Sequence, residues 1–349
     1  MRQDKKMGRH HNDELVNIYK GIGEQGVAAC ASGEWPRSRY FLSHCVSTED
    51  GSLVPRTFDT DPVVGFNALL CDEPAHLALL RSAQGVFKAF VDDIAFNAIA
   101  PERRDELAKG VYWCQSRGWH TVVAIFQENP SLLPEADREQ WRAVSTEAVE
   151  RLGEALASSL ASSPVPELRI QLHGYRVCAD GAMIAVFVEA DDGEDGGDDG
   201  DDDDDGGGGG GGFMPLRERA KEVGTVALGG LTSRPKKLIH VTMGRVLRLP
   251  EGTTDEELAA VNRVAERWAS ALLSGVMPTA RNWDEESGVP PPSSSSSSST
   301  TTTSLPCVGD TLRLSEVVLS TEQQWWMARY TVVARVPLIS ASRGERTNT

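Results

Sequence analysis

The chain has 349 residues, of which 40% are hydrophobic and 25% are charged, and this content excludes a wholly disordered protein. The formal net charge is −16, but eleven of the acids lie in one Asp/Gly tract at residues 191–212, which leaves a net charge of about −5 for the rest. A mildly acidic folded part argues against tight binding of long duplex nucleic acid through a broad basic face.

The N-terminal segment has little hydrophobic periodicity, and we expect residues 1–39 to form a loosely ordered arm. It lacks the apolar region of a secretory signal, and no later stretch reaches membrane-span length, so we expect a soluble cytoplasmic or nuclear protein with no membrane partner. The six cysteines are scattered without metal-site spacing, which favours free thiols in a reducing compartment.

The ordered part is predicted to begin near Tyr40. Residues 40–55 predict a strand followed by a turn at Asp50-Gly51, and residues 63–70 predict a second strand. Residues 74–90 then show apolar side chains at helical spacing. These elements precede a pattern that occurs twice in the remaining chain.

Each occurrence starts with a charged helical stretch, beginning at Pro101 or Pro215, and continues into an apolar run that holds one histidine. The histidines are His120 and His240, and each lies ten residues before a proline. A long amphipathic helix is predicted after each run, at about 134–161 and from Thr254, where TDEE is typical of a capping box. Paired strand-like runs close each half, at 168–177 and 182–189 and again at 312–319 and 328–338.

This order predicts an internal duplication of the α/β (α+β) class, with two antiparallel sheets flanked by helices around a central cleft. We expect one bilobal domain at residues 40–338, with a first lobe at about 100–190 and a second at about 213–338. The tracts at 191–212 and 284–304 are predicted to be low-complexity inserts, and residues 339–349 a tail. The two histidines would then face each other across a pseudo-twofold axis.

The residues around the histidines indicate phosphoryl chemistry. In a strand, His240 and Thr242 project from one face, where an imidazole and a hydroxyl can hold a phosphoryl group. Two imidazoles can serve as general base and general acid near neutral pH without a metal. In the first half, Thr121 directly follows His120, and Val122 is the second residue after it. In a regular strand Thr121 therefore points away from His120, unless a bulge turns its hydroxyl to the same face. Two arginines follow His240, Arg245 and Arg248, and only Arg248 shares its strand face.

The His-Val-Thr triplet at residues 240–242 and the closing hairpin resemble the 2H phosphoesterase superfamily, the LigT-like proteins with two H-x-[T/S] motifs, over roughly residues 100–338. The first motif is degenerate because of Val122. The resemblance implies a metal-independent phosphodiesterase, without a cofactor, that acts on a 2',3'-cyclic phosphate or an RNA end. It implies His120, His240 and Thr242 as catalytic residues. The expected partner is a small phosphorylated nucleotide or short RNA end, and the expected state is a monomer.

Thr121, Arg248 and Tyr330 are the candidate substrate-binding residues. Two other hypotheses stay open: a noncatalytic nucleotide-binding or phosphate-binding module that has lost the hydroxyl at position 122, and a duplication that serves only packing while the low-complexity tracts mediate protein contacts. Trp325 and Trp326, near the closing turn, are predicted to anchor the core or a loop, with stacking on a nucleobase as the alternative.

Overall fold

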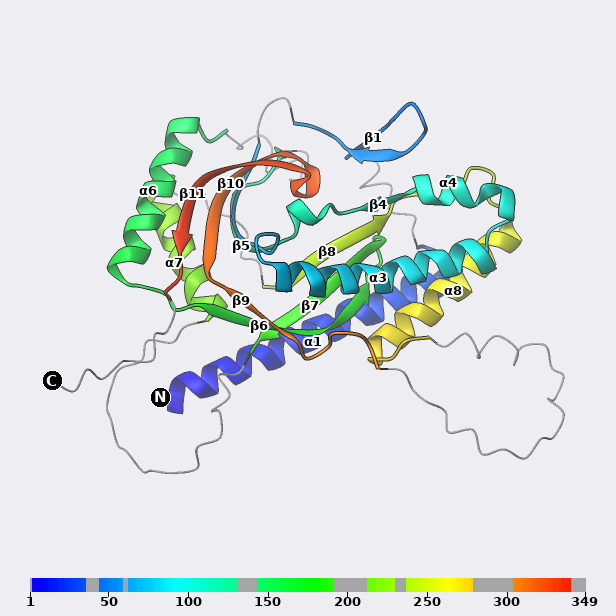
Figure 1. Cartoon of the computed structure of the whole chain (residues 1–349), viewed down its shortest axis with the longest axis horizontal. Coiled ribbons are helices and arrows are strands. Elements are labelled where there is room, and N and C mark those ends of the chain that lie inside the picture. The colour runs from blue at the N-terminus through cyan, green and yellow to red at the C-terminus, as the bar shows by residue number, and fades with distance from the viewer. Residues whose placement is uncertain are drawn as a thin grey trace.

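The computed structural model describes residues 2–35, 44–58, 62–130, 143–190, 212–229, 237–278 and 304–339. These segments form two antiparallel sheets flanked by helices, which confirms the predicted fold class (Figure 1). The two predicted inserts, at 191–212 and 284–304, lie almost entirely outside the described residues, as does the first part of the helix predicted at 134–161.

The first sheet has the strand order β11-β10-β3-β5. Its strands are β3 (Val63–Leu69), β5 (His120–Gln127), β10 (Glu316–Gln324) and β11 (Arg329–Pro337). Two helices pack on this sheet: α6 (Thr146–Ser162) against β11 and α7 (Phe213–Ala227) against β5. Figure 1 shows both helices at the same end of the molecule. The closing hairpin predicted from the sequence is the antiparallel pair β10 and β11.

The second sheet has the order β4-β8-β7-β6-β9. Its strands are β4 (Val111–Trp113), β6 (Leu168–Val177), β7 (Ala182–Glu189), β8 (Ile239–Val246) and β9 (Thr311–Leu314). Helix α3 (Pro74–Asn97) contacts β8, and α8 (Asp255–Leu273) contacts β6. Every residue of β7 except Glu189 is buried, as expected for a central strand.

Short elements join these layers. The pair β1 (Cys45–Ser47) and β2 (Leu53–Pro55) forms a hairpin whose turn contains Gly51 at φ 81°, which confirms the predicted turn. The charged stretch at Pro101 forms η1 (Pro101–Arg103) and α4 (Arg104–Lys109), and η2 (Ser116–Gly118) precedes β5. The turn between β10 and β11 is η6 (Trp325–Met327).

The two lobes are not contiguous stretches of chain, and this corrects the predicted division at 100–190 and 213–338. Strands β4, β6 and β7 come from the first predicted lobe, yet they share a sheet with β8 and β9 from the second. Strands β10 and β11 of the second half pair instead with β3 and β5. Hydrophobic alternation identifies a strand and its buried face, but it carries no information about which strand lies next to it.

The N-terminal arm predicted at 1–39 is also corrected, because residues Arg2–Ser32 form helix α1. The helix packs along α8, β6 and β7, and Figure 1 shows it extended beneath the second sheet. Leu15, Tyr19 and Cys30 are completely buried. The Tyr19 hydroxyl hydrogen-bonds the backbone of Phe187 and Ile239 at 2.8 and 2.9 Å, which fixes the helix beside the start of β8.

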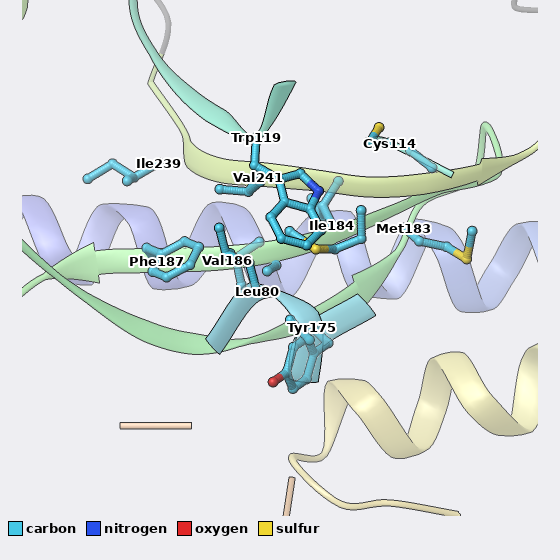
Figure 2. Packing of buried hydrophobic residues seen from close by; sticks show 14 of the residues in the cluster. Leu80, Cys114, Trp119, Tyr175, Met183, Ile184, Val186, Phe187, Ile239 and Val241 are labelled. Carbon is cyan, nitrogen blue, oxygen red and sulfur yellow. The ribbon is translucent and has the colours of Figure 1, made fainter. Parts of the chain in front are cut away.

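A continuous core fills the space between the sheets and helices. Trp119, directly before His120, is 1% exposed and belongs to this core, as predicted. Figure 2 shows its ring among buried side chains that include Val241 of β8 and Ile184 of β7. The capping box at Thr254 is present, with its Oγ1 accepting from Glu257 N. None of the described helices combines the length and apolar character that a membrane span needs.

Candidate functional site

A cleft with a volume of about 580 Å³ lies where β5 of the first sheet meets β8 of the second. His120 of β5 and His240 and Thr242 of β8 all line it. The structure therefore brings together in one cleft the three residues that the sequence points to as catalytic. Other lining residues come from α1, β3, β10 and η6: Ile18, Val63, Gly65, Asn67, Ser320, Glu322, Trp325, Trp326 and Met327.

Regular strand alternation places the β8 pair. His240 and Thr242 are partly exposed, whereas Ile239, Val241 and Met243 between and around them are buried. The alternation follows from the two-residue period of an extended strand whose other face packs on the core. An imidazole and a hydroxyl thus stand side by side on the cleft face of β8.

The first motif is arranged differently. Val122 lines the cleft together with His120, whereas Thr121 is completely buried and its Oγ1 has no hydrogen-bond partner in the described part of the chain. A register shift in the pairing of β3 with β5 does occur, between Phe66 and Asn67, but it lies beyond Thr121. The bulge therefore leaves Thr121 pointing away from the cleft.

The His120 ring is oriented by the backbone. Its Nδ1 lies 2.7 Å from the carbonyl oxygen of Gly118, and a carbonyl can only accept, so the neutral ring carries its proton on Nδ1. Burial lowers the pKa of His120, and the hydrogen bond to Gly118 opposes this only in part. The neutral ring therefore predominates at pH 7 and leaves Nε2 as a proton acceptor.

The three predicted substrate-binding residues do not line the cleft. In addition to the buried Thr121, Arg248 donates from Nη2 to Gly51 O at 2.8 Å and so ties the end of β8 to the β1–β2 hairpin. Tyr330 donates its hydroxyl proton to Arg117 O at 2.9 Å. Strand parity placed Arg248 on the face of His240, but the side chain lies beyond the end of β8.

The cleft wall formed by β10 holds residues that the sequence did not single out. Ser320 and Glu322 lie two residues apart on β10, and Asn67 of β3 donates from Nδ2 to Ser320 Oγ at 3.0 Å. Asn67 is also the register partner of Val122, so a polar pair lies directly beside the position that lacks a hydroxyl. In the sequence, the two-residue spacing of Ser320 and Glu322 indicates that they share one face of a strand, but it does not reveal which strand lies beside them.

Glu322 is an unusual carboxyl group in this setting. Burial raises its pKa to about 7, against the opposing effect of hydrogen bonds from the backbone N–H groups of Met327 and Trp326. Its Oε1 accepts from Met327 N at 2.7 Å. Trp326 and Met327 have φ values of 61° and 54°, in the left-handed region that costs energy for residues with a side chain. Glu322 therefore holds a strained turn at the edge of the cleft.

The two tryptophans of this turn pack against neighbouring rings, and both also line the cleft. Trp325 is 8% exposed and makes an edge contact with His44, the ring centroids being 4.4 Å apart, which anchors the turn as predicted. Trp326 packs on Tyr112 with centroids 4.8 Å apart. Both rings also line the cleft, so aromatic surface faces any ligand bound there. The described residues contain no group of three or more His, Cys, Asp and Glu side chains that could hold a metal ion.

No family model matches the chain, and no curated protein matches it by sequence. Two solved structures are similar to it in fold. One is LigT from E. coli complexed with 3'-AMP, with 12% sequence identity, a TM-score of 0.36, and coverage of 80% of this chain and 100% of that chain. The other is TT0787 of Thermus thermophilus, with 13% identity, a TM-score of 0.37, and coverage of 80% and 99%. With TM-scores this low, neither match supports a functional assignment.

Proposed function

We propose that this protein is a two-histidine phosphodiesterase that cleaves a 2',3'-cyclic phosphate or a related RNA end without a metal ion. The observation that carries the proposal is the placement of two imidazoles and one hydroxyl, from strands of two different sheets, in a single cleft. General acid and general base catalysis needs two groups of opposite protonation state on either side of the reacting phosphorus. We assign these two roles to His120 and His240.

We assign the base role to His120 and the acid role to His240. Nε2 of neutral His120 takes a proton from water as the water oxygen bonds to phosphorus. His240 gives its proton to the ribose oxygen as the bond from that oxygen to phosphorus breaks. Thr242 donates a hydrogen bond to a nonbridging oxygen, where negative charge increases in the transition state. The product is a phosphomonoester with a free ribose hydroxyl, and transfer of the proton from His120 to His240 through solvent restores the starting state.

The cleft also limits the substrate. Its volume of about 580 Å³ suits a mononucleotide or the end of a short RNA, and aromatic and aliphatic side chains form much of its wall. Among the described lining residues, Lys237 is the one lysine or arginine, and it pairs with Glu14 at 3.0 Å. Because the lining has so few cations, we expect a cyclic phosphate, which carries a single charge, to bind in preference to a polyphosphate.

We infer a monomeric protein of the cytoplasm or nucleus.

A second candidate function is a noncatalytic module that binds a nucleotide or another phosphorylated ligand. Val122 favours it, because this apolar side chain lines the cleft at the place where a second hydroxyl would hold the phosphoryl group. Such a module would keep the affinity that His240 and Thr242 provide and would lack turnover.

The test is turnover of nucleoside 2',3'-cyclic phosphates and short RNAs with a cyclic end, in excess chelator. His120→Ala and His240→Ala should each reduce kcat by about 10²-fold or more. His173→Ala is the matched control, because His173 lies on β6 outside the cleft lining, with its ring 6.2 Å from that of Tyr19. Turnover lost in chelator, or unchanged in either cleft variant, contradicts the proposal. Binding without turnover in the folded wild type supports the second candidate.

A further inference from the structure

One buried arginine connects the two strands that carry the cleft histidines. Arg217 of α7 is 6% exposed, and its guanidinium donates only to backbone carbonyls. Nη2 lies 3.0 Å from Val122 O and 2.6 Å from Leu238 O, and Nη1 lies 2.9 Å from Lys237 O. Val122 is two residues after His120, and Leu238 is two residues before His240. The same nitrogen therefore bonds to the backbone two residues from each histidine.

The sheet topology explains why a side chain is needed at this point. Strand β5 is the edge of the first sheet, and β4 pairs with β8 only from Gly244 to Val246. The part of β8 that holds His240 has β7 on one side and meets β5 on the other, without a ladder between them. Arg217 spans this gap, because it donates to one carbonyl of β5 and to two carbonyls directly before β8. A planar guanidinium has several donors in a fixed geometry, which a lysine ammonium does not reproduce.

Arg217 also places a positive charge next to the cleft wall, because the three residues whose carbonyls it contacts all line the cleft. Within the described part of the chain, no carboxylate lies within ion-pair distance of it, and Glu189 acts on it only from further away. The Phe213 ring packs on the guanidinium, with the central carbon 4.8 Å from the ring centroid. Burial lowers the pKa of Arg217 to about 10, so the group stays charged at neutral pH. A charge that no carboxylate neutralises favours an anion nearby.

We propose that Arg217 is a positioning residue that sets the separation of His120 and His240 and supplies positive charge beneath the phosphoryl group they share. The proposal deepens the proposed function and rests on it for the shared phosphoryl ligand. Its physical content is that Arg217 holds β5 to the residues that lead into β8, where no ladder joins the two strands, so loss of Arg217 changes the distance between the imidazoles. The alternative is that Arg217 only satisfies buried carbonyls and stabilises the fold.

Arg176 offers a matched control for that alternative. It is likewise 6% exposed and donates only to backbone carbonyls, those of Tyr19, Tyr175 and Leu272, which lie on α1, β6 and α8 and not on β5 or β8. Arg176→Lys and Arg217→Lys should therefore lower the Tm by similar amounts. Only Arg217→Lys should change how the two histidines act together.

The experiment uses the full-length chain and inorganic phosphate as the probe, with imidazole NMR signals assigned by His120→Ala and His240→Ala. In the wild type and in Arg176→Lys, phosphate should shift both signals along one binding curve. In Arg217→Lys the affinity should fall severalfold, and turnover of a cyclic phosphate should fall through kcat by about 10²-fold, as for other small misplacements of catalytic groups. Equal phosphate affinity in the two lysine variants overturns the proposal.

Two further outcomes separate this proposal from the proposed function. If the wild type shows no turnover but phosphate still shifts both imidazoles and Arg217→Lys weakens it, the positioning role holds and the catalytic function fails. If phosphate shifts neither imidazole in the wild type, the shared site is refuted. If Arg217→Lys does not fold, the test instead follows the NMR signal of the Arg217 Nε–H group in the wild type during phosphate titration. A change in that signal on phosphate binding supports the proposal, and an unchanged signal while both imidazoles shift overturns it.

Discussion

Replacing Glu322 by glutamine removes an ionisable group from the cleft but keeps an oxygen that can accept the hydrogen bond from Met327 N. Burial raises the pKa of the Glu322 carboxyl to about 7 from an ordinary 4.5. Since one pKa unit corresponds to about 1.4 kcal/mol, the ionised carboxylate destabilises the folded state by about 3 kcal/mol above pH 7. Relaxation of the cleft and entry of water reduce this, so we expect a measured effect of about 2 to 3 kcal/mol.

The sign of the effect fixes its pH dependence. The folded state holds the Glu322 proton more tightly than the unfolded chain does, so the free energy of unfolding of the wild type falls as the pH rises from 4.5 to about 7. Glu322→Gln lacks this loss. The two proteins should therefore have similar free energies of unfolding near the acid end of the range, and the variant should be the more stable above pH 7. Titration of the histidines affects both proteins and largely cancels in the difference.

Urea unfolding of the wild type and Glu322→Gln at several pH values between about 5 and 8 measures this difference. Glu154→Gln, an exposed position on α6, controls for removal of one negative charge from the surface. A difference between wild type and Glu322→Gln that stays constant with pH, or that grows toward acid, would refute the reasoning. The reasoning would also be refuted if Glu154→Gln gained as much free energy of unfolding over the wild type, with the same pH dependence, as Glu322→Gln does.

Three other predictions concern the helix, the first motif and the base. Gly26→Ala should destabilise the protein by about 2 kcal/mol or more in urea unfolding, because the new Cβ would lie 1.9 Å from Val177 O; Gly21→Ala on the same helix, with nothing within 4 Å, should stabilise it by about 0.5 kcal/mol. Equal effects would show that α1 does not dock as described. Val122→Thr should tighten phosphate binding by about 0.5 to 1.5 kcal/mol in calorimetry, because it adds a hydroxyl to the cleft face of β5; unchanged affinity would mean that the phosphoryl group lies elsewhere. The pKa of His120 is lowered by burial, so the acid limb of kcat/KM, measured in Glu322→Gln to avoid a second titration, should lie below pH 6.5, and a limb above that value contradicts His120 as the base.

The β8 site could be predicted because its cause is local. Buried Ile239, Val241 and Met243 alternate with His240 and Thr242, and that alternation is written in consecutive residues. The same holds for the capping box at Thr254, whose two hydrogen bonds join residues three apart. Where residues close in sequence determine the local structure, the sequence pattern is enough to predict that structure.

Helix α1 was missed because two of its buried positions hold glycine. Its packed face runs through Leu15, Tyr19, Gly23, Gly26 and Cys30 at helical spacing. A search for apolar periodicity counts large apolar side chains. On this face the glycines have no side chain, which lets the helix lie directly against the backbone of β6. Docking of this kind can be read only when the partner surface is known.

Glu322 and the Asn67–Ser320 pair were missed for a different reason. Their place in the cleft depends on β10 pairing with β3, and the hydrogen bond between Asn67 and Ser320 joins residues 253 positions apart. Sequence spacing shows that Ser320 and Glu322 share a face of β10, but no local pattern specifies the strand beside it. Arg217 is similar, since its carbonyl partners lie on β5 and in the segment directly before β8.

The pairing of β3 with β10 has a consequence for how the protein is made. Because β3 ends at Leu69 and β10 begins at Glu316, most of the chain must leave the ribosome before the first sheet can receive its third strand. Until then one edge of β3 is unpaired and one wall of the cleft is missing, although both histidines have already been synthesised. Contacts of such long range also slow folding. Termination of synthesis before residue 316 would therefore release a product that contains every predicted catalytic residue and no complete cleft in which to use them.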